Sequence, residues 1–150
     1  MIRPLLPILR KNNSSRILLV SSMSGVACWP LLGAYQISKF AIEAISDTLR
    51  QELRDSGIQV GCMEPGPNKT GWATKYARRI EISKDYNQAD LLARASCGYT
   101  IQEPETTLPF FWKMFDSPIM PRRVATSREF VDFAVKEAQE KIQDWSIIYE

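Results

Sequence analysis

Residues 16–63 read RILLVSSMSGVACWPLLGAYQISKFAIEAISDTLRQELRDSGIQVGCM and decide the fold. Ile17–Val20 is a continuous apolar run between polar segments, which predicts a strand buried on both faces. The longest periodic stretch runs from Gly33 to about Arg54 and predicts a helix. Gly57 then provides a stop, and residues 58–63 read as a second strand. The apolar stripe of the helix is formed by Ala41, Ile45, Leu49 and Leu53, widened by Ile42 and Ala44.

A strand, a helix and a second strand in this order make a βαβ crossover, the unit from which parallel sheets are built. The predicted fold class is therefore α/β, a Rossmann-like, doubly wound parallel sheet. Ligands of such sheets bind beyond the carboxyl ends of the strands. The segments that follow Val20 and Met63 are accordingly where chemistry is expected.

Composition excludes several classes of function. The 150 residues carry a formal charge of +2 without a basic cluster, so we expect no nucleic-acid partner. Arg78-Arg79 and Arg122-Arg123 are expected to be solvated surface charges. The absence of histidine rules out imidazole catalysis, and no metal site is predicted. The cysteines form no CxxC or disulfide pattern, and of the three we expect Cys28 and Cys62 to be buried apolar side chains.

Beyond Thr70 the pattern is weaker. Residues 71–79 and 83–95 could be helical, and Ser127–Ile142 is predicted to be a helix with Ser127 as its N-cap. Its apolar face would contain Phe130, Phe133, Ala134 and Ala138. Residues 145–149 could form a last strand.

Three polar side chains gather where the topology places a ligand. Tyr35 and Lys39 are one helical turn apart, and Ser22 stands just past the first strand. A phenol has a pKa of about 10, and a neighbouring ammonium favours its ionised form. Tyr35 could then exchange a proton with an alcohol or carbonyl oxygen while Ser22 donates a hydrogen bond to that oxygen. The remaining step, hydride transfer, needs a nicotinamide.

Ser22 followed by Tyr35-Gln36-Ile37-Ser38-Lys39 resembles the Ser-x12-Tyr-x-x-Ser-Lys signature of the short-chain dehydrogenases/reductases. Residues 64–70, Glu-Pro-Gly-Pro-Asn-Lys-Thr, are similar to the family's Pro-Gly-x-x-x-Thr segment. The resemblance implies that Tyr35 is the acid/base, that Lys39 lowers its pKa and binds the nicotinamide ribose, and that Ser22 orients the reacting oxygen. It also implies that backbone groups around Pro65 and Gly66, with the hydroxyl of Thr70, contact the nicotinamide.

The same resemblance implies NAD or NADP as cofactor and a secondary alcohol or ketone as small-molecule substrate. The sequence of residues 38–50 most resembles the retinol and hydroxysteroid dehydrogenase branch of the family, so a retinoid- or steroid-like substrate is expected. Homo-oligomerisation through the 35–56 helix and a cytoplasmic location are also expected, with an upstream membrane anchor left open. The aromatic segment 110–115 would lie over the substrate pocket.

The sequence departs from the family pattern at its start. The seven glycines contain no G-x-G pair, so the glycine-rich turn for the pyrophosphate is missing. We therefore expect a partial Rossmann-like domain over residues 1–150, with its N-terminal half missing, a catalytic core at 1–70 and a substrate-binding and C-terminal region at 71–150. Both strands are expected to have unpaired edges. The alternative is a catalytically inactive truncated form that acts as an interaction or dimerisation module.

Overall fold

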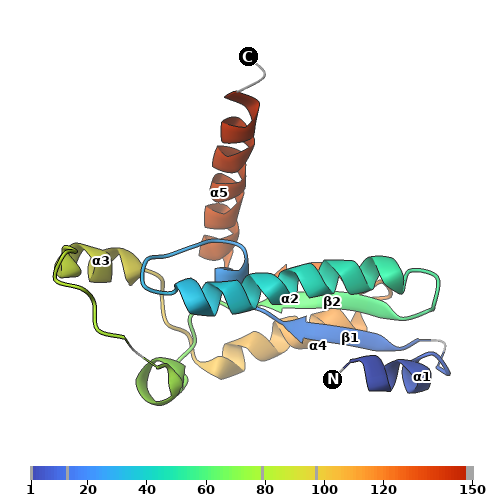
Figure 1. Cartoon of the computed structure of the whole chain (residues 1–150). Coiled ribbons are helices and arrows are strands. Elements are labelled where there is room, and N and C mark those ends of the chain that lie inside the picture. Colours follow the sequence, from blue (N-terminus) through green and yellow to red (C-terminus); the bar gives the residue numbers. More distant parts are fainter. Residues whose placement is uncertain (1, 13, 79, 97, 148–150) are drawn as a thin grey trace.

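The computed structural model describes residues 2–12, 14–78, 80–96 and 98–147 (Figure 1). Short helical turns occupy η1 (Arg3–Leu5), η2 (Met23–Gly25), η3 (Trp72–Tyr76, a π-helix) and η4 (Pro104–Thr107). The α-helices are α1 (Leu6–Leu9), α2 (Gly33–Glu52), α3 (Gln88–Ala95), α4 (Leu108–Asp116) and α5 (Arg128–Ser146). The strands are β1 (Arg16–Val20), β2 (Gln59–Glu64) and β3 (Arg123–Ala125).

The strands form one parallel sheet in the order β1-β2-β3 among the described residues. Val20 lies opposite Met63 in the first pair, and Cys62 lies opposite Arg123 in the second. This confirms the predicted α/β crossover. The expectation that both strands have unpaired edges is wrong for β2, because the unpredicted β3 occupies its second edge.

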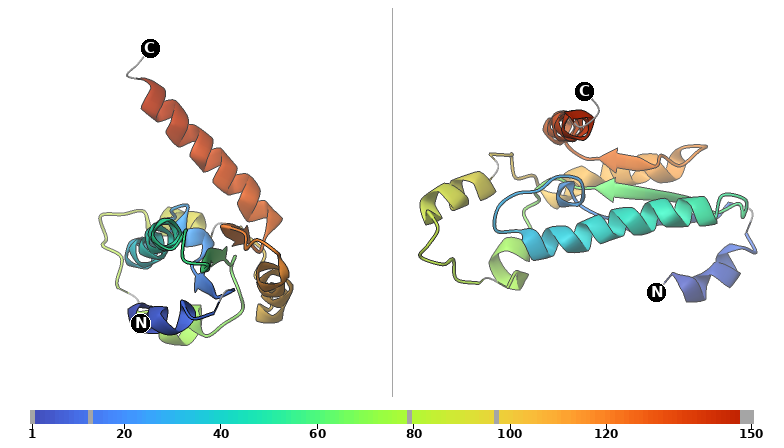
Figure 2. Two further views of the ribbon diagram at one scale, coloured as in Figure 1. Left: turned by 90° about the vertical axis from the view of Figure 1, so that its right-hand side faces the viewer. Right: turned by 45° about the horizontal axis from the view of Figure 1, so that its top comes forward.

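Helices cover both faces of the sheet, with α2 along one face and α4 on the other (Figures 1 and 2). On the α2 side, buried Val60 and Leu53 pack with Ile17. On the α4 side, Met114 packs with Met63. A Cβ on Gly61 would lie 2.8 Å from the Cε atom of Met114 and 2.6 Å from a backbone carbonyl oxygen, so only glycine allows this close approach.

The orientation of α2 differs from the predicted apolar stripe. Its buried positions include polar Gln36, Glu43 and Ser46, whereas Ile45 is 47% exposed. The stripe reaches the core only near its end, where Leu53 is buried. Polar groups can be buried here because they have partners, as the Nε2 atom of Gln36 donates to the carbonyl of Trp29 at 2.9 Å. Gly57, with a φ of 73°, provides the predicted stop after the helix.

The aromatic segment 110–115 falls within α4 and packs on the sheet through Phe111 and Met114. None of its residues lines the large cavity described below, so the expected position over a substrate pocket is not observed. Its apolar side chains instead form part of the hydrophobic core between α4 and the sheet.

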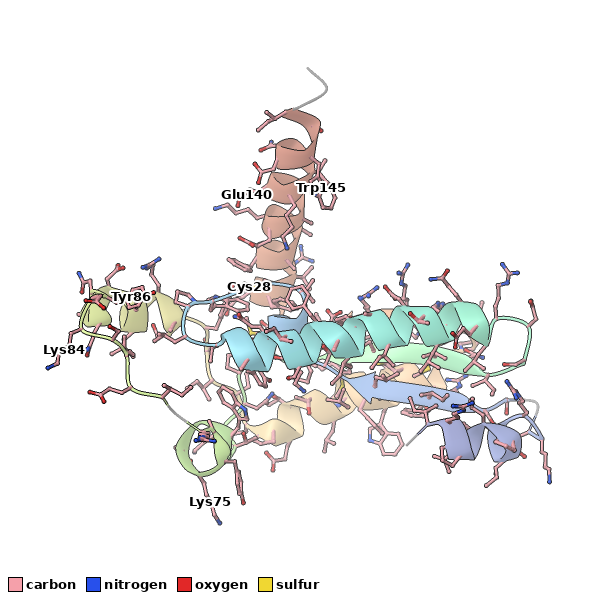
Figure 3. All side chains as sticks on the ribbon, in the orientation of Figure 1. Cys28, Lys75, Lys84, Tyr86, Glu140 and Trp145 are labelled. Atoms are coloured by element: carbon pink, nitrogen blue, oxygen red, sulfur yellow. The ribbon has the colours of Figure 1, made fainter. Side chains whose placement is uncertain are left out.

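Helix α5 begins after Ser127, whose side chain accepts a hydrogen bond from the amide of Phe130, as predicted for an N-cap. Phe130 is buried, but Ala138 is exposed, so the packed face is shorter than expected. The far end of the helix projects from the body and carries Trp145, 70% exposed (Figures 1 and 3). The possible last strand at 145–149 is wrong for 145 and 146, which are helical, and 148–150 lie outside the described residues.

Residues 71–95 form a long excursion whose regular elements are η3 and α3. Of the two segments that could be helical, 71–79 contains the π-helix Trp72–Tyr76 and 83–95 contains α3. Asn87 caps α3 by accepting a hydrogen bond from the amide of Asp90. Cys62 is buried as expected, whereas Cys28 is exposed in the loop before α2 (Figure 3). Within the described part of the chain, every helix falls short of the length and apolarity needed to cross a bilayer.

Candidate active site

The loop after β1 holds Ser22 at the carboxyl edge of the sheet. Ser22 is buried in extended conformation, and its Oγ atom accepts from the amide of Ser24 at 3.2 Å, which caps the turn η2. A Cβ on Gly25 would lie 3.0 Å from the carbonyl oxygen of Lys39, so this glycine lets the loop approach α2. The hydroxyl of Ser21 donates to the same carbonyl at 3.3 Å. The loop is therefore fastened to the first turns of the helix.

Tyr35 and Lys39 lie together at the start of α2. The Nζ atom of Lys39 is 5.7 Å from the ring centroid of Tyr35 and donates to the carbonyl of Val20 at 3.3 Å. The ring of Tyr35 packs against that of Trp72, with centroids 4.7 Å apart at 50°. The predicted pair is thus brought to the carboxyl end of β1, two residues before Ser22.

Backbone hydrogen bonds join this loop to the segment after β2. The amide of Ser21 donates to the carbonyl of Met63 at 2.8 Å, and the amide of Met23 donates to the carbonyl of Pro65 at 3.0 Å. The sheet therefore places Ser22 beside the Pro-Gly segment, although the two are more than forty residues apart in the chain.

In the segment 65–70, the backbone of Gly66 already has protein partners. Its amide donates to Thr126 Oγ1 at 3.2 Å, and its carbonyl accepts from Asn68 Nδ2 at 3.0 Å. These two hydrogen bonds fix the backbone of Gly66, and the expected contact of Pro65 and Gly66 with a nicotinamide stays a prediction. The Oδ1 atom of Asn68, by contrast, is buried without a hydrogen-bond partner among the described residues. Thr70 Oγ1 accepts from the amide of Trp72 at 3.3 Å, which leaves its hydroxyl hydrogen to donate elsewhere.

A cavity of about 930 Å³ opens beside Tyr35, between the start of α2 and the excursion 71–95. Its walls are mainly apolar, and Arg78 and Glu81 are the charged residues among the described lining. Leu31, in the wall next to α2, has a φ of 66°, a left-handed conformation that branched side chains rarely adopt. Sequence reasoning missed Leu31, Asn68 and Trp72, because contacts between separate segments give no local pattern.

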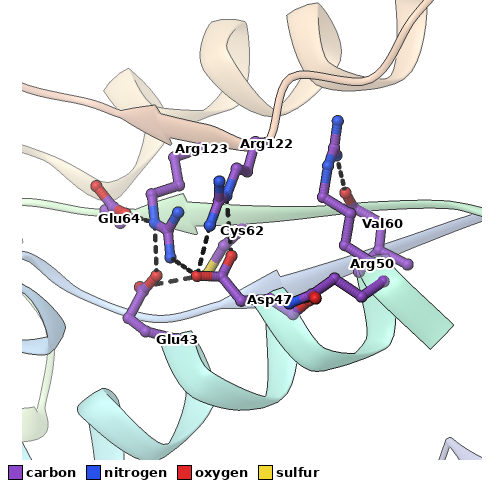
Figure 4. Close-up of polar contacts among 9 residues, drawn as sticks. Glu43, Asp47, Arg50, Val60, Cys62, Glu64, Arg122 and Arg123 are labelled. Atoms are coloured by element: carbon purple, nitrogen blue, oxygen red, sulfur yellow. Dashed lines mark hydrogen bonds and ion pairs between the residues drawn. The ribbon is translucent and has the colours of Figure 1, made fainter. Parts of the chain in front are cut away.

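A cluster of charged side chains joins α2 to β2 and β3 below the carboxyl edge (Figure 4). The Nε atom of Arg123 donates to Glu43 at 3.0 Å and lies 3.2 Å from Glu64, while its Nη2 atom donates to Asp47 at 2.8 Å. Arg122 binds Asp47 through two further hydrogen bonds. The expectation that Arg122 and Arg123 are solvated charges is wrong for Arg123, because β3 directs it onto two buried carboxyl groups.

The cluster shifts the pKa values of its members. Burial raises the pKa of Glu64 to about 7, and the nearby Glu43 adds to this effect while Arg123 opposes it. The hydrogen bond from Arg122 lowers the pKa of Asp47 to about 2. Burial raises the pKa of the Cys62 thiol to about 12, so it remains protonated and donates to Glu43 at 3.3 Å.

The parallel sheet, the serine at its carboxyl edge and the tyrosine and lysine on the following helix define the class of Rossmann-like oxidoreductases. Comparison with known sequences agrees, since residues 1–81 match the model of the short chain dehydrogenase family. The chain belongs to this family.

Two curated relatives are similar to the chain. An uncharacterized oxidoreductase, YbbO, of Escherichia coli K12 is 40% identical over 94 residues, covering 63% of this chain and 35% of the relative. Oxidoreductase BOA17 of Botryotinia fuckeliana is 32% identical over 142 residues, covering 91% of this chain and 52% of the relative. The match thus spans about a third of the first of these relatives and about half of the second.

Solved structures share the fold. A short-chain dehydrogenase from Streptomyces avermitilis superposes with a TM-score of 0.82 at 23% identity, covering 99% of this chain and 56% of that one. A family member from Burkholderia phymatum, solved with NAD, has a TM-score of 0.67 at 19% identity and covers 95% and 54%. A serine dehydrogenase, solved with NADP+, has a TM-score of 0.62 at 18% identity and covers 83% and 48%.

Proposed function

We propose that this chain carries the catalytic and nicotinamide-facing part of an NAD- or NADP-dependent oxidoreductase that interconverts a secondary alcohol and a ketone. The single observation that carries the proposal is the contact of Lys39 with Tyr35 at the carboxyl end of β1, on the wall of a cavity large enough for a substrate. The resemblance of residues 38–50 to the retinol and hydroxysteroid branch favours a retinoid- or steroid-like substrate.

The side chains fit the nicotinamide end of the cofactor. The unpartnered acceptor of Asn68 suits a carboxamide N–H, the hydroxyl of Thr70 can donate to a carboxamide oxygen, and Lys39 has donors left for a ribose hydroxyl. Similar folds from Burkholderia phymatum and from a serine dehydrogenase were solved with NAD and NADP+, respectively, which supports the same cofactor class here. When bound, the nicotinamide supplies or accepts the hydride that no amino-acid side chain can transfer.

The remaining work falls to side chains of this chain. In reduction, the carbonyl carbon receives the hydride and the phenol of Tyr35 donates its proton to the carbonyl oxygen, which gives the alcohol; solvent then returns a proton to Tyr35. The Lys39 ammonium stabilises the phenolate left behind, and Ser22 donates a hydrogen bond to the same oxygen. Oxidation of the alcohol runs through the same positions in reverse.

The test uses the 150-residue chain with NADH, NADPH and reduced nicotinamide mononucleotide, which lacks the pyrophosphate and adenosine. Ketone-dependent loss of absorbance at 340 nm reports turnover, and NMR line broadening reports binding. Tyr35→Phe is expected to lower turnover by at least about 100-fold while binding and circular dichroism stay unchanged. Tyr76→Phe is the matched control, since Tyr76 is 71% exposed and outside the cavity wall. Unchanged turnover in Tyr35→Phe, or no binding of any of the three nucleotides, would refute the proposal.

A second candidate function, the binding of another chain, is favoured by the outward face of α2. Ile37 and Ile45 are 74% and 47% exposed on the same helix that buries Glu43 and Ser46. We propose that this face pairs two copies of the chain, as the expected oligomer through the 35–56 helix requires, because exposed apolar surface favours association. Ile37→Glu should then shift sedimentation toward a monomer, whereas Ile119→Glu, at another exposed isoleucine, should leave it unchanged. A wild-type chain that sediments as a monomer at all concentrations would exclude this candidate.

A further inference from the structure

The cavity beside Tyr35 has walls whose apolar side chains are left partly in solvent. Ile80 is 87% exposed, Leu92 is 55% exposed and Trp72 is 40% exposed, although all three line the cavity. Single exposed apolar residues are common, but a group of them around one hollow is typical of a binding site. Its volume of about 930 Å³ lies near the upper end of the range for small-molecule sites.

Trp72 is the residue of this wall that packs against the ring of Tyr35. Its ring packs on that of Tyr35, so a substrate whose oxygen reaches the phenol must extend past the indole. The residue belongs to a single-turn π-helix, a local geometry that often marks functional sites. Leu31, also in the lining, is a strained, left-handed residue of the kind that clusters at ligand sites.

We propose that Trp72 is the specificity-determining residue of this site and that it selects a ketone or secondary alcohol with a long or bulky apolar body. This inference rests on the proposed function for the identity of the reacting group. The body would lie against the indole of Trp72 and continue along Leu92 and Ile80, which removes their exposed apolar surface from water. The charged lining residues, Arg78 and Glu81, have opposite signs, so the wall gives no net preference for an anionic or a cationic substrate.

The experiment compares straight methyl ketones of increasing length, from 2-butanone to 2-tridecanone, with the 150-residue chain and the cofactor that it uses. The ratio kcat/KM is expected to rise by at least about 100-fold along the series, because each methylene placed in an apolar pocket adds to binding. Trp72→Ala should lower kcat/KM for 2-tridecanone by at least about tenfold more than it lowers kcat/KM for 2-butanone. Trp72→Phe should restore most of the loss. The matched control is Trp112→Ala, at a tryptophan of α4 that is 58% exposed and outside the cavity wall.

A second readout separates this proposal from the proposed function. The corresponding alcohol, 2-tridecanol, is titrated into the chain, and its affinity is measured by calorimetry without cofactor. Tight binding that Trp72→Ala and Leu92→Asp both weaken, with no turnover of any ketone, would refute the oxidoreductase proposal and keep the apolar site. The role of Trp72 would be overturned if kcat/KM did not depend on the length of the ketone, or if Trp72→Ala affected short and long ketones equally.

Discussion

The Nζ atom of Lys39 lies 5.7 Å from the ring centroid of Tyr35 and donates to the carbonyl of Val20 at 3.3 Å. The lysine is therefore held between the helix that carries the tyrosine and the strand that leads to Ser22. The lysine side chain thus links the tyrosine to the end of the strand that the serine follows.

Replacing this lysine should affect chemistry more than folding. Lys39→Met removes the charge beside Tyr35 and the ribose donors, so kcat for ketone reduction should fall by about 100-fold or more. Thermal unfolding should change little, because Lys39 is only partly buried and loses one hydrogen bond to a carbonyl. Lys113→Met, at an exposed lysine of α4, provides the control. Activity of Lys39→Met within threefold of wild type would contradict the assigned role.

Glu64 should make stability depend on pH. Its folded-state pKa of about 7 lies above the ordinary value of 4.5, so between these values the folded chain keeps a proton that the unfolded chain releases. This stability contribution is complete below pH 4.5 and is lost as the pH rises through 7. The loss amounts to about 3 kcal/mol, from 1.36 kcal/mol per pKa unit.

The variant Glu64→Gln removes this dependence. Urea unfolding at pH 5 and pH 8 should show the variant gaining stability relative to wild type as the pH increases, whereas Glu105→Gln, at an exposed position, should follow wild type. A difference between Glu64→Gln and wild type that stays constant with pH would show that Glu64 titrates normally.

Asp47 should show the opposite dependence. Its pKa is lowered to about 2, so its ion pairs with Arg122 and Arg123 stabilise the fold above pH 3.8, and this contribution disappears as the pH falls toward 2. Asp47→Asn should therefore be less stable than wild type at pH 7 and nearly equal to it near pH 2. Asp116→Asn, at an exposed carboxylate, is the control for unfolding curves across this range. Equal stability of Asp47→Asn and wild type at pH 7 would count against the cluster.

Gly61 should tolerate no side chain. A Cβ there would meet a backbone carbonyl at 2.6 Å and Met114 at 2.8 Å, so Gly61→Ala should destabilise the fold by roughly 1–3 kcal/mol through overpacking. The same substitution at Gly33, where no atom lies within 4 Å, should be neutral or stabilising, since alanine favours helix more than glycine. Chemical denaturation gives the change in the free energy of unfolding for each variant. Equal changes at the two sites would be inconsistent with the packing described.

The sequence predicted the crossover of β1, α2 and β2 to within two residues of each boundary, because buried strands and long helices leave strong apolar patterns. It did not predict β3, whose three residues include one β-branched side chain, Val124, and take their strand conformation from pairing with β2. Nor could it tell which way α2 faces, since the buried Glu43 finds its partner Arg123 eighty residues later.

Within the candidate site, spacing alone singled out Ser22, Tyr35 and Lys39, because they lie on one local unit of chain. The catalytic roles given to them are proposals, and Tyr35→Phe and Lys39→Met test two of them. Asn68 lay inside the Pro-Gly-x-x-x-Thr segment without a role of its own, because only the fold shows that its Oδ1 atom is buried and unpartnered among the described residues. Trp72 carried no signal, because its contact with Tyr35 joins segments that are far apart in the chain.

The hydrogen bonds from Ser21 to Met63 and from Met23 to Pro65 join the two loops through backbone atoms alone. Their spacing does not depend on which side chains the loops carry. The cavity wall, in contrast, is built from side chains, most of them from the excursion 71–95 and the rest from residues 30–35. Under the proposed function, wall residues that do not touch Tyr35, such as Leu92 and Ile80, could be redesigned to change substrate selectivity while the backbone bonds between the two loops are left in place.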